Sequence, residues 1–414
     1  MAIEQSNRLS PSGRYALKNI IRLIPAVVIV AALLNTVSCG NGLLDPVNSG
    51  SATPTSTSTA GTGALAFVTN FNDGMVSSFT RNIKTGVLKR TGQVTAGAKK
   101  GPRGVIAAPS GSFLYVANIN DGNIYQFSIN PTNGTLTPLS PAFVSNGSGS
   151  GPDQIAINPD GTFLWVTGAG NGVAGNGTVT TYTINSSTGQ LTKNGTAKGF
   201  TSPFGIAADS TGAFVFVTDH GAGLVYWFSI GTGGALSLVG SPISDLGPAA
   251  GAPGFIAIDP SGTFIYVTDL NAGVLSVIQT TSSQLAFFST QPTASSANMP
   301  IGIGFATVSG VANFVFTANQ GDSTLWSFQL QSPGNPAIPV AFGSLNLNAP
   351  TGLVVDPQNA FLYTTNQNAG TVSQFSLSST CFSSPAAAPC FVGSVATESP
   401  TNTKSGPFGI TLAQ

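Results

Sequence analysis

Two side chains in this sequence have chemistry suited to an active or binding site. His220, in the stretch VTDHGAG, is the sole histidine among 414 residues, and it directly follows Asp219. Imidazole is the side chain whose ordinary pKa suits proton transfer near neutral pH. Arg103, in KKGPRG, carries a planar guanidinium that can hold a carboxylate or a phosphate through two hydrogen bonds. The alternatives are an incidental histidine and a solvated loop charge, and the sequence leaves both open.

Each of these residues lies in a segment that recurs along the chain. Arg103 follows a proline that begins a short apolar run, and His220 follows a β-rich hexamer. The seven prolines are Pro102, Pro152, Pro203, Pro253, Pro300, Pro350 and Pro407, and the residues after them are Arg103, Asp153, Phe204, Gly254, Ile301, Thr351 and Phe408. The seven hexamers span 65–70, 113–118, 163–168, 214–219, 264–269, 314–319 and 361–366, and they end on Asn70, Asn118, Gly168, Asp219, Asp269, Asn319 and Asn366.

The repeat predicts an all-β fold, a seven-bladed β-propeller with four strands in each blade. The hexamers begin 47 to 51 residues apart, and turn formers, an aromatic run and a weaker outer run follow them. The first repeat lacks a post-proline strand, whereas the chain ends on an extra one, GPFGITLAQ. We expect this terminal run to pair beside LAFVTN at 65–70. It would close a propeller that spans residues 64–414 and leave no open sheet edge in the first blade.

In a propeller of this kind, the loops that precede the post-proline strands and the loops that follow the hexamers share one face of the ring. We expect a small molecule or a protein partner to bind there, with contacts from Arg103, Asn118, Asp153, Asp219, His220 and Asp269. Asn and Asp also favour turns and bond their own backbone, so a purely structural role is the alternative for the set. We expect no metal, because a hard cation wants about six converging oxygen ligands and no compact acidic motif supplies them. No cofactor is expected either.

The composition argues against nucleic-acid binding. Charged residues make up only 7% of the chain, and no lysine or arginine lies between Lys198 and Lys404. A duplex-binding surface needs a field of basic side chains to displace counterions.

We also expect the protein to be a monomer.

The N-terminal region predicts export. Arg8, Arg14, Lys18 and Arg22 precede the apolar run 23–34, which suits a signal peptide and is short for a membrane span. The following TVSCG resembles the bacterial lipobox, in which the cysteine, here Cys39, is lipidated; an ordinary signal peptide is the alternative. Residues 40–63 form a Gly/Ser/Thr-rich linker. We therefore expect residues 1–39 to direct the protein to the bacterial cell envelope, periplasmic or on the cell surface, where only a lipid anchor holds it to the membrane.

Two further cysteines, Cys381 and Cys390, bracket the stretch CFSSPAAAPC. In an exported chain such a pair predicts a disulfide that closes a loop. A metal half-site is the alternative, although no histidine or further cysteine lies near in the sequence.

The hexamers FLYVAN and FIYVTD, with P-x-G-x-F before them and TGxLT after them, resemble the YVTN-repeat propellers and the 6-phosphogluconolactonase-like lactonase family. Active members of that family carry G-x-x-P-R-H in one loop and a glutamate after V-x-N in the next. This chain keeps Arg103, but Gly104 stands at the histidine position and Ile119 at the glutamate position. We therefore expect a ligand- or protein-binding scaffold without catalysis. A lactone hydrolase, with Arg103 and His220 as its weakly supported catalytic residues, and a structural surface propeller are the alternatives.

Overall fold

A computed structural model describes residues 65–98, 101–147, 149–245, 251–259, 261–281, 283–293, 299–308, 312–332, 335–342, 347–380, 390–397 and 406–413. Three predictions depend on residues outside these ranges. Cys39 and Cys381 lie outside them, as do residues 1–63, and the side chain of Cys390 is not described. Lipid attachment, the linker and the disulfide therefore stay predictions.

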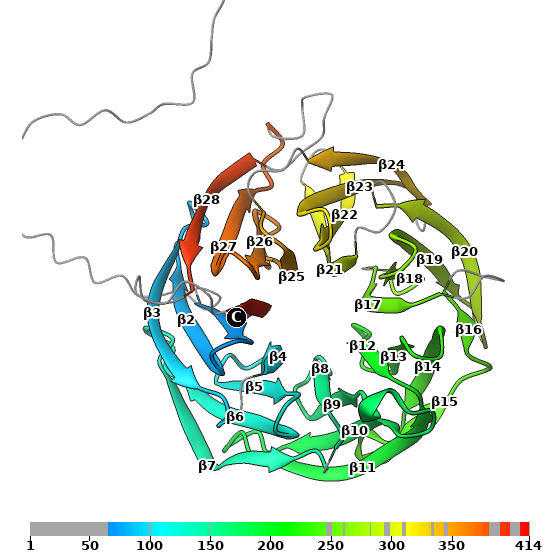
Figure 1. The fold of residues 1–414 in the computed structure, drawn as a ribbon, viewed down its shortest axis with the longest axis horizontal. Helices are drawn as coiled ribbons and strands as arrows, with labels where there is room; N and C mark the ends of the chain where they lie inside the picture. The colour runs from blue at the N-terminus through cyan, green and yellow to red at the C-terminus, as the bar shows by residue number, and fades with distance from the viewer. Residues whose placement is uncertain are drawn as a thin grey trace, which may run out of the picture. The chain divides into compact units, whose positions relative to one another are not determined.

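Seven antiparallel sheets form a ring around one axis, which confirms the seven-bladed propeller (Figure 1). The inner strands are, from blade 1 to blade 7, β29 (Pro407–Ala413), β4 (Pro102–Ala107), β8 (Pro152–Ile157), β12 (Pro203–Ala208), β17 (Pro253–Ile258), β21 (Pro300–Val308) and β25 (Pro350–Val355). The second strands are β1 (Leu65–Asn70), β5 (Phe113–Asn118), β9 (Phe163–Gly168), β13 (Phe214–Asp219), β18 (Phe264–Asp269), β22 (Ala312–Asn319) and β26 (Phe361–Asn366).

The third strands are β2 (Met75–Arg81), β6 (Asn123–Ile129), β10 (Gly177–Ile184), β14 (Leu224–Ile230), β19 (Val274–Thr280), β23 (Thr324–Ser332) and β27 (Thr371–Ser376). The outer strands are β3 (Leu88–Thr95), β7 (Leu136–Ser145), β11 (Leu191–Phe200), β15 (Leu236–Leu238) with β16 (Ile243–Ser244), β20 (Leu285–Pro292), β24 (Asn335–Phe342) and β28 (Cys390–Ala396). Two short 3₁₀ turns are η1 (Gly170–Gly172) and η2 (Thr232–Gly234).

The C-terminal strand closes the ring, as predicted. β29 pairs antiparallel with β1, with Leu65 opposite Ala413 and Asn70 opposite Pro407. In Figure 1 the C-terminus accordingly lies beside the first blade. The blade that begins the chain therefore takes its inner strand from the end of the chain.

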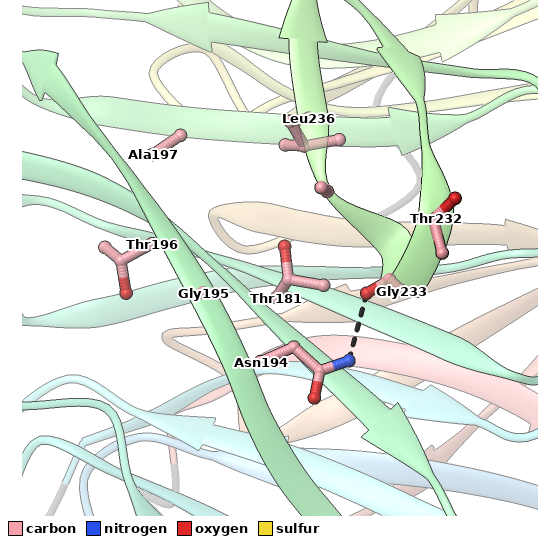
Figure 2. A pocket seen from close by; sticks show the side chains of 9 residues that line it. Thr181, Asn194, Gly195, Thr196, Ala197, Thr232, Gly233 and Leu236 are labelled. Atoms are coloured by element: carbon pink, nitrogen blue, oxygen red, sulfur yellow. Dashed lines mark hydrogen bonds between the residues drawn. The ribbon is translucent and has the colours of Figure 1, made fainter.

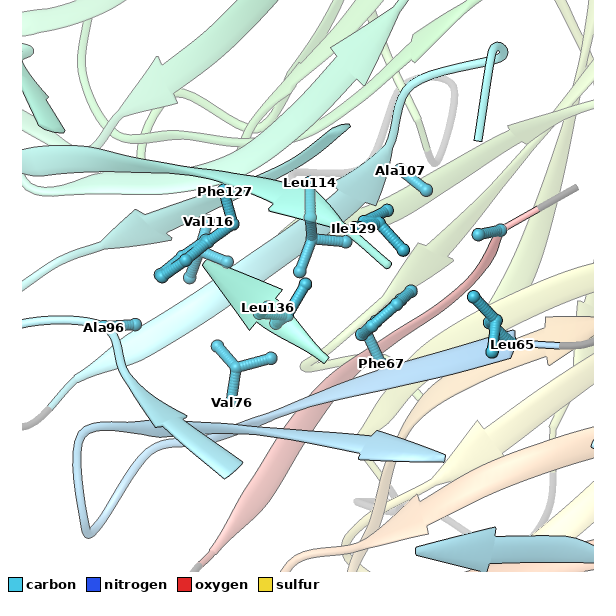
Figure 3. Packing of buried hydrophobic residues seen from close by; sticks show 11 residues of the cluster. Leu65, Phe67, Val76, Ala96, Ala107, Leu114, Val116, Phe127, Ile129 and Leu136 are labelled. Atoms are coloured by element: carbon cyan, nitrogen blue, oxygen red, sulfur yellow. The ribbon is translucent and has the colours of Figure 1, made fainter. Parts of the chain in front are cut away.

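The hexamers are continuous apolar runs because neighbouring blades bury both faces of each second strand. Odd positions, such as Leu65 and Phe67 of blade 1, pack against even positions of blade 2, such as Leu114 and Val116 (Figure 3). Phe67, Leu114 and Val116 have no exposed area. The same alternation recurs around the ring, so the core is a series of layers between blades.

In blades 2 and 7, the tyrosine at hexamer position 3 bonds across this layer to a glycine turn of the next blade. The Tyr115 hydroxyl donates to the Gly189 carbonyl at 2.8 Å, and the Tyr363 hydroxyl donates to the Gly86 carbonyl at 2.8 Å. Burial raises the pKa of both tyrosines, so their hydroxyls stay protonated and remain donors. Gly189 has a φ of 72°, a left-handed conformation that favours glycine, and a Cβ added at this position would overlap the ring of Phe113. This is why the turn between third and outer strands needs glycine.

Candidate functional site

The inner strands begin with a bulge that sets where each post-proline residue lies. In blade 4, Pro203 is opposite Asp219 and Ile206 is opposite Val217, so two residues of β12 face Thr218 alone. The Thr218 hydroxyl resolves this mismatch, because it accepts from Gly205 N at 2.7 Å and donates to the Gly254 carbonyl of blade 5 at 2.6 Å. One hydroxyl thus pairs a bulged amide within its own blade and a carbonyl of the next.

The same bridge recurs in blades 1, 3 and 7, which also carry threonine at hexamer position 5. Thr69 donates to the Arg103 carbonyl at 2.7 Å, Thr167 to the Phe204 carbonyl at 2.8 Å, and Thr365 to the Phe408 carbonyl at 2.9 Å. Each accepting carbonyl belongs to the residue directly after the proline of the following blade. The backbone of these post-proline residues is therefore held from the neighbouring blade.

We use the word rim for the residues that directly follow the seven prolines together with the residues that directly follow the seven hexamers. Both sets lie on the face predicted to bind a ligand, at the end of the ring where the inner strands begin. The rim consists of Phe71, Arg103, Ile119, Asp153, Ala169, Phe204, His220, Gly254, Leu270, Ile301, Gln320, Thr351, Gln367 and Phe408. Half of these residues have apolar side chains, and Arg103 is the one lysine or arginine among them.

Arg103 is paired with Asp153 across the boundary between blades 2 and 3. Its Nη1 donates to Asp153 Oδ2 at 2.6 Å, and the side chains of Arg103 and Asp153 are 27% and 2% exposed. The guanidinium carbon also lies 5.4 Å from the ring centre of Phe71 and 5.1 Å from that of Phe408. Gln154 Nε2 holds the other carboxylate oxygen at 2.9 Å. The sequence predicted both charged residues as ligand contacts, but it did not predict that they bind each other.

Gly104, at the position of the family's histidine, is packed against blade 3. A Cβ at this position would overlap the backbone carbonyl oxygen of Asp153. Glycines also occupy the corresponding positions in blades 1, 4, 6 and 7, whereas blades 3 and 5 have Gln154 and Phe255 there. A Cβ on Gly205 would meet the Gly254 carbonyl in the same way. The absence of a side chain at position 104 therefore follows from the close approach of two inner strands.

His220 lies two blades from Arg103, and its contacts are different. Its ring centre is 6.5 Å from that of Phe204, which itself makes an edge-on contact with Phe255 at 5.2 Å. Within the part of the chain that the structure describes, the buried His220 Nδ1 has no hydrogen-bond partner. Arg103 contacts Asp153 and His220 contacts Phe204, so the structure gives the two predicted catalytic candidates separate partners.

The other predicted contacts, Asn118, Asp219 and Asp269, have no exposed area. Asp219 accepts from Thr201 N and Ser202 N, both at 2.7 Å, and its negative charge adds to burial in raising the pKa of Tyr226.

Asp269 bonds the neighbouring loop in the same way, because its carboxylate accepts from Ala252 N at 2.6 Å. Asn118 Nδ2 donates to the Ala96 carbonyl at 2.7 Å. These side chains tie the loop before the inner strand to the turn after the hexamer, which is the structural alternative noted for the set. A contact between them and a ligand stays a prediction.

The structure also contains two cavities away from the rim that the sequence did not predict. One, of about 510 Å³, lies at the outside of blades 3 and 4, between β11 and the η2 turn (Figure 2). Asn194 lines this cavity, and its side-chain Nδ2 donates to the Gly233 carbonyl at 2.9 Å. The other, of about 330 Å³, lies at the opposite ends of the inner strands, next to Asp209 and Asp259. Neither cavity contains a rim residue.

The described ranges contain neither a candidate metal site nor a candidate membrane-spanning helix. Those ranges contain no group of three or more His, Cys, Asp or Glu side chains placed to hold a metal ion. They also contain no helix that is long and apolar enough to cross a membrane.

Comparison with known proteins gives a consistent picture of the fold. The family model described as "Lactonase, 7-bladed beta-propeller" matches residues 60–149, 144–304 and 205–381. A putative 6-phosphogluconolactonase from Bacteroides uniformis superposes with a TM-score of 0.69 at 14% identity, covering 85% of this chain and 100% of the other. The periplasmic gluconolactonase of Pseudomonas aeruginosa gives 0.65 at 16% identity, with 84% and 99% covered. No curated protein matches the sequence.

Proposed function

The chain belongs to the seven-bladed β-propeller lactonase family, and within that family we propose that it is a ligand-binding module that does not hydrolyse lactones. The observation that carries the proposal is the packing of Gly104 against the Asp153 carbonyl. Opening a lactone ring requires a base that activates water and a donor for the developing oxyanion. Position 104 has no room for the family's histidine, and Ile119 replaces its glutamate.

The binding part of the proposal is supported by the surroundings of Arg103. The partly exposed guanidinium lies between Phe71 and Phe408 and beside a nearly buried carboxylate. Hydrogen-bonding groups set among apolar side chains are typical of small-molecule sites. A small ligand with hydroxyl or carbonyl oxygens fits this combination.

A binding titration with glucono-1,5-lactone, its open-chain acid and glucose tests the proposal. We expect at least one of them to bind the domain, and we expect Arg103→Ala to remove the binding. Arg90→Ala is the matched control, because Arg90 lies on the outer strand β3 and its variant leaves the rim intact. Equal affinities in the wild type and Arg103→Ala would contradict a site at Arg103.

Lactone hydrolysis is the second candidate, and two observations favour it. The family match covers most of the chain, and the buried His220 Nδ1 has no hydrogen-bond partner among the described residues. In this alternative His220 activates water and Arg103 stabilises the oxyanion. This alternative predicts lactone turnover that disappears in His220→Ala. The binding module predicts no lactone turnover in either protein.

A further inference from the structure

We propose that Asp153 determines the charge selectivity of the rim: by pairing with Arg103, it excludes phosphate and carboxylate ligands and favours a neutral ligand with hydroxyl or carbonyl oxygens. The inference rests on the proposed binding function, since it concerns the ligand class of that same site. An arginine after the repeat proline suggests an anion site when the sequence is considered alone. In the structure, the anion that pairs with Arg103 is the Asp153 carboxylate of the protein itself.

The Asp153 carboxylate is hard to displace. Its side chain is only 2% exposed, and its two oxygens accept from Arg103 Nη1 at 2.6 Å and Gln154 Nε2 at 2.9 Å. A ligand anion that took its place on Arg103 would leave a buried carboxylate without its cation. Breaking a buried pair in this way is strongly unfavourable.

Besides Arg103, the basic side chain of the rim is His220, which lies two blades away. Arg103 is the rim's one lysine or arginine, and its charge is balanced by Asp153. The other rim groups that remain available to a ligand include apolar rings, such as Phe71 beside Arg103, and neutral amides elsewhere on the rim. Gln320 and Gln367 of blades 6 and 7 provide two such amides, and they bond each other at 2.6 Å. Such surroundings suit hydroxyl and carbonyl oxygens better than a phosphate.

The pair also spans a blade boundary that lacks the threonine bridge. Blade 2 has Ala117 at hexamer position 5, whereas Thr69 of blade 1 and Thr167 of blade 3 each donate to the next blade. A purely structural reason for Asp153 is therefore available. If the role of Asp153 were purely structural, its replacement would lower the stability of the domain and leave the class of ligand unchanged.

The test is a calorimetric titration of the folded domain with 6-phosphogluconate. We expect weak or no binding to the wild type, and a gain in affinity of about tenfold or more in Asp153→Asn, because hydrogen bonds to charged groups contribute about that factor. Adding Arg103→Ala to Asp153→Asn is expected to abolish the gain. Asp160→Asn is the matched control, since it removes the same charge from an exposed turn at the other end of an inner strand.

The proposal is overturned if folded Asp153→Asn gains no affinity or if Asp160→Asn gains as much. Should Asp153→Asn fail to fold, Asp153→Thr carries the test, because Thr351 occupies the corresponding position in blade 7 and is fully buried there. The gain in anion binding is measured without any neutral ligand. A failure of the glucose and lactone titrations would therefore count against the proposed function and leave this result standing.

Discussion

Arg81 of blade 1 and Asp356 of blade 7 form an ion pair in which neither side chain has any exposed area. Arg81 Nη1 lies 2.8 Å from Asp356 Oδ2. The other oxygen of Asp356 accepts from Ala360 N and Phe361 N, so the carboxylate also closes the turn between β25 and β26. The pair therefore joins the first and last blades at the closure of the ring.

Removing one partner of this pair is expected to destabilise the propeller strongly. Asp356→Asn leaves the Arg81 guanidinium buried without its counter-charge, at a cost of about 3–5 kcal/mol in the free energy of unfolding. The double variant Arg81→Met/Asp356→Asn is expected to recover part of that loss. Urea unfolding of the two single variants and the double variant measures the coupling between the residues. Additive losses would show that the pair is not coupled.

The strand exchange at the closure gives a second prediction. Deleting residues 406–414 removes β29 and exposes the edge of β1, so we expect an aggregated or insoluble domain. A permuted chain that carries the same residues before Leu65, joined by a short flexible linker, is expected to restore solubility. Size-exclusion chromatography compares the three proteins. A truncated domain that stays monomeric with an unchanged melting temperature would contradict the closing role of β29.

The threonine bridge gives a third prediction. Thr218→Val keeps the shape of the side chain but leaves the Gly205 amide and the Gly254 carbonyl without this partner. Unpaired buried polar groups cost about 1–3 kcal/mol, so we expect a loss of that size in the free energy of unfolding. Thr218→Ser keeps the hydroxyl and should lose less. If valine and serine are equally tolerated, the hydroxyl does not hold the bulge.

The fourth prediction concerns the N-terminal segment, which lies outside the described residues. Metabolic labelling with a fatty-acid analogue is expected to mark the wild-type protein, because Cys39 stands where a lipobox places its lipidated cysteine. Cys39→Ala should be unlabelled. Equal labelling of the two proteins would contradict the lipoprotein prediction.

The repeat pattern predicted the fold in detail because each blade is a local unit. The prolines and hexamers marked the first residue of each inner strand and the second strands of each blade, and the missing first strand revealed the closure. The broken outer strand of blade 4 was not predicted, although Gly240, which has a φ of 64°, and Pro242 lie in the gap between β15 and β16. A glycine and a proline at that spacing were available as a signal.

The candidate site was predicted less well, because its contacts join residues of different blades. Arg103 and Asp153 are 50 residues apart, and only the packing of β4 beside β8 of the next blade makes them partners. The ring of Asn and Asp residues was predicted with two possible roles. Its hydrogen bonds to loop backbone became visible only when the loops were placed. The residue types alone identified the candidate site residues, whereas only the structure identified the groups to which they bond.

We propose that this lactonase-family propeller binds its ligand without hydrolysing lactones. The most direct measurement is the rate of hydrolysis of 6-phosphogluconolactone and glucono-1,5-lactone by the purified domain, beside Arg103→Ala and His220→Ala. General acid–base groups contribute about 10²–10⁴-fold each, and positions 104 and 119 provide none. We predict that all three proteins leave the lactones to open at the uncatalysed rate. Turnover by the wild type that either substitution abolishes would contradict the claim.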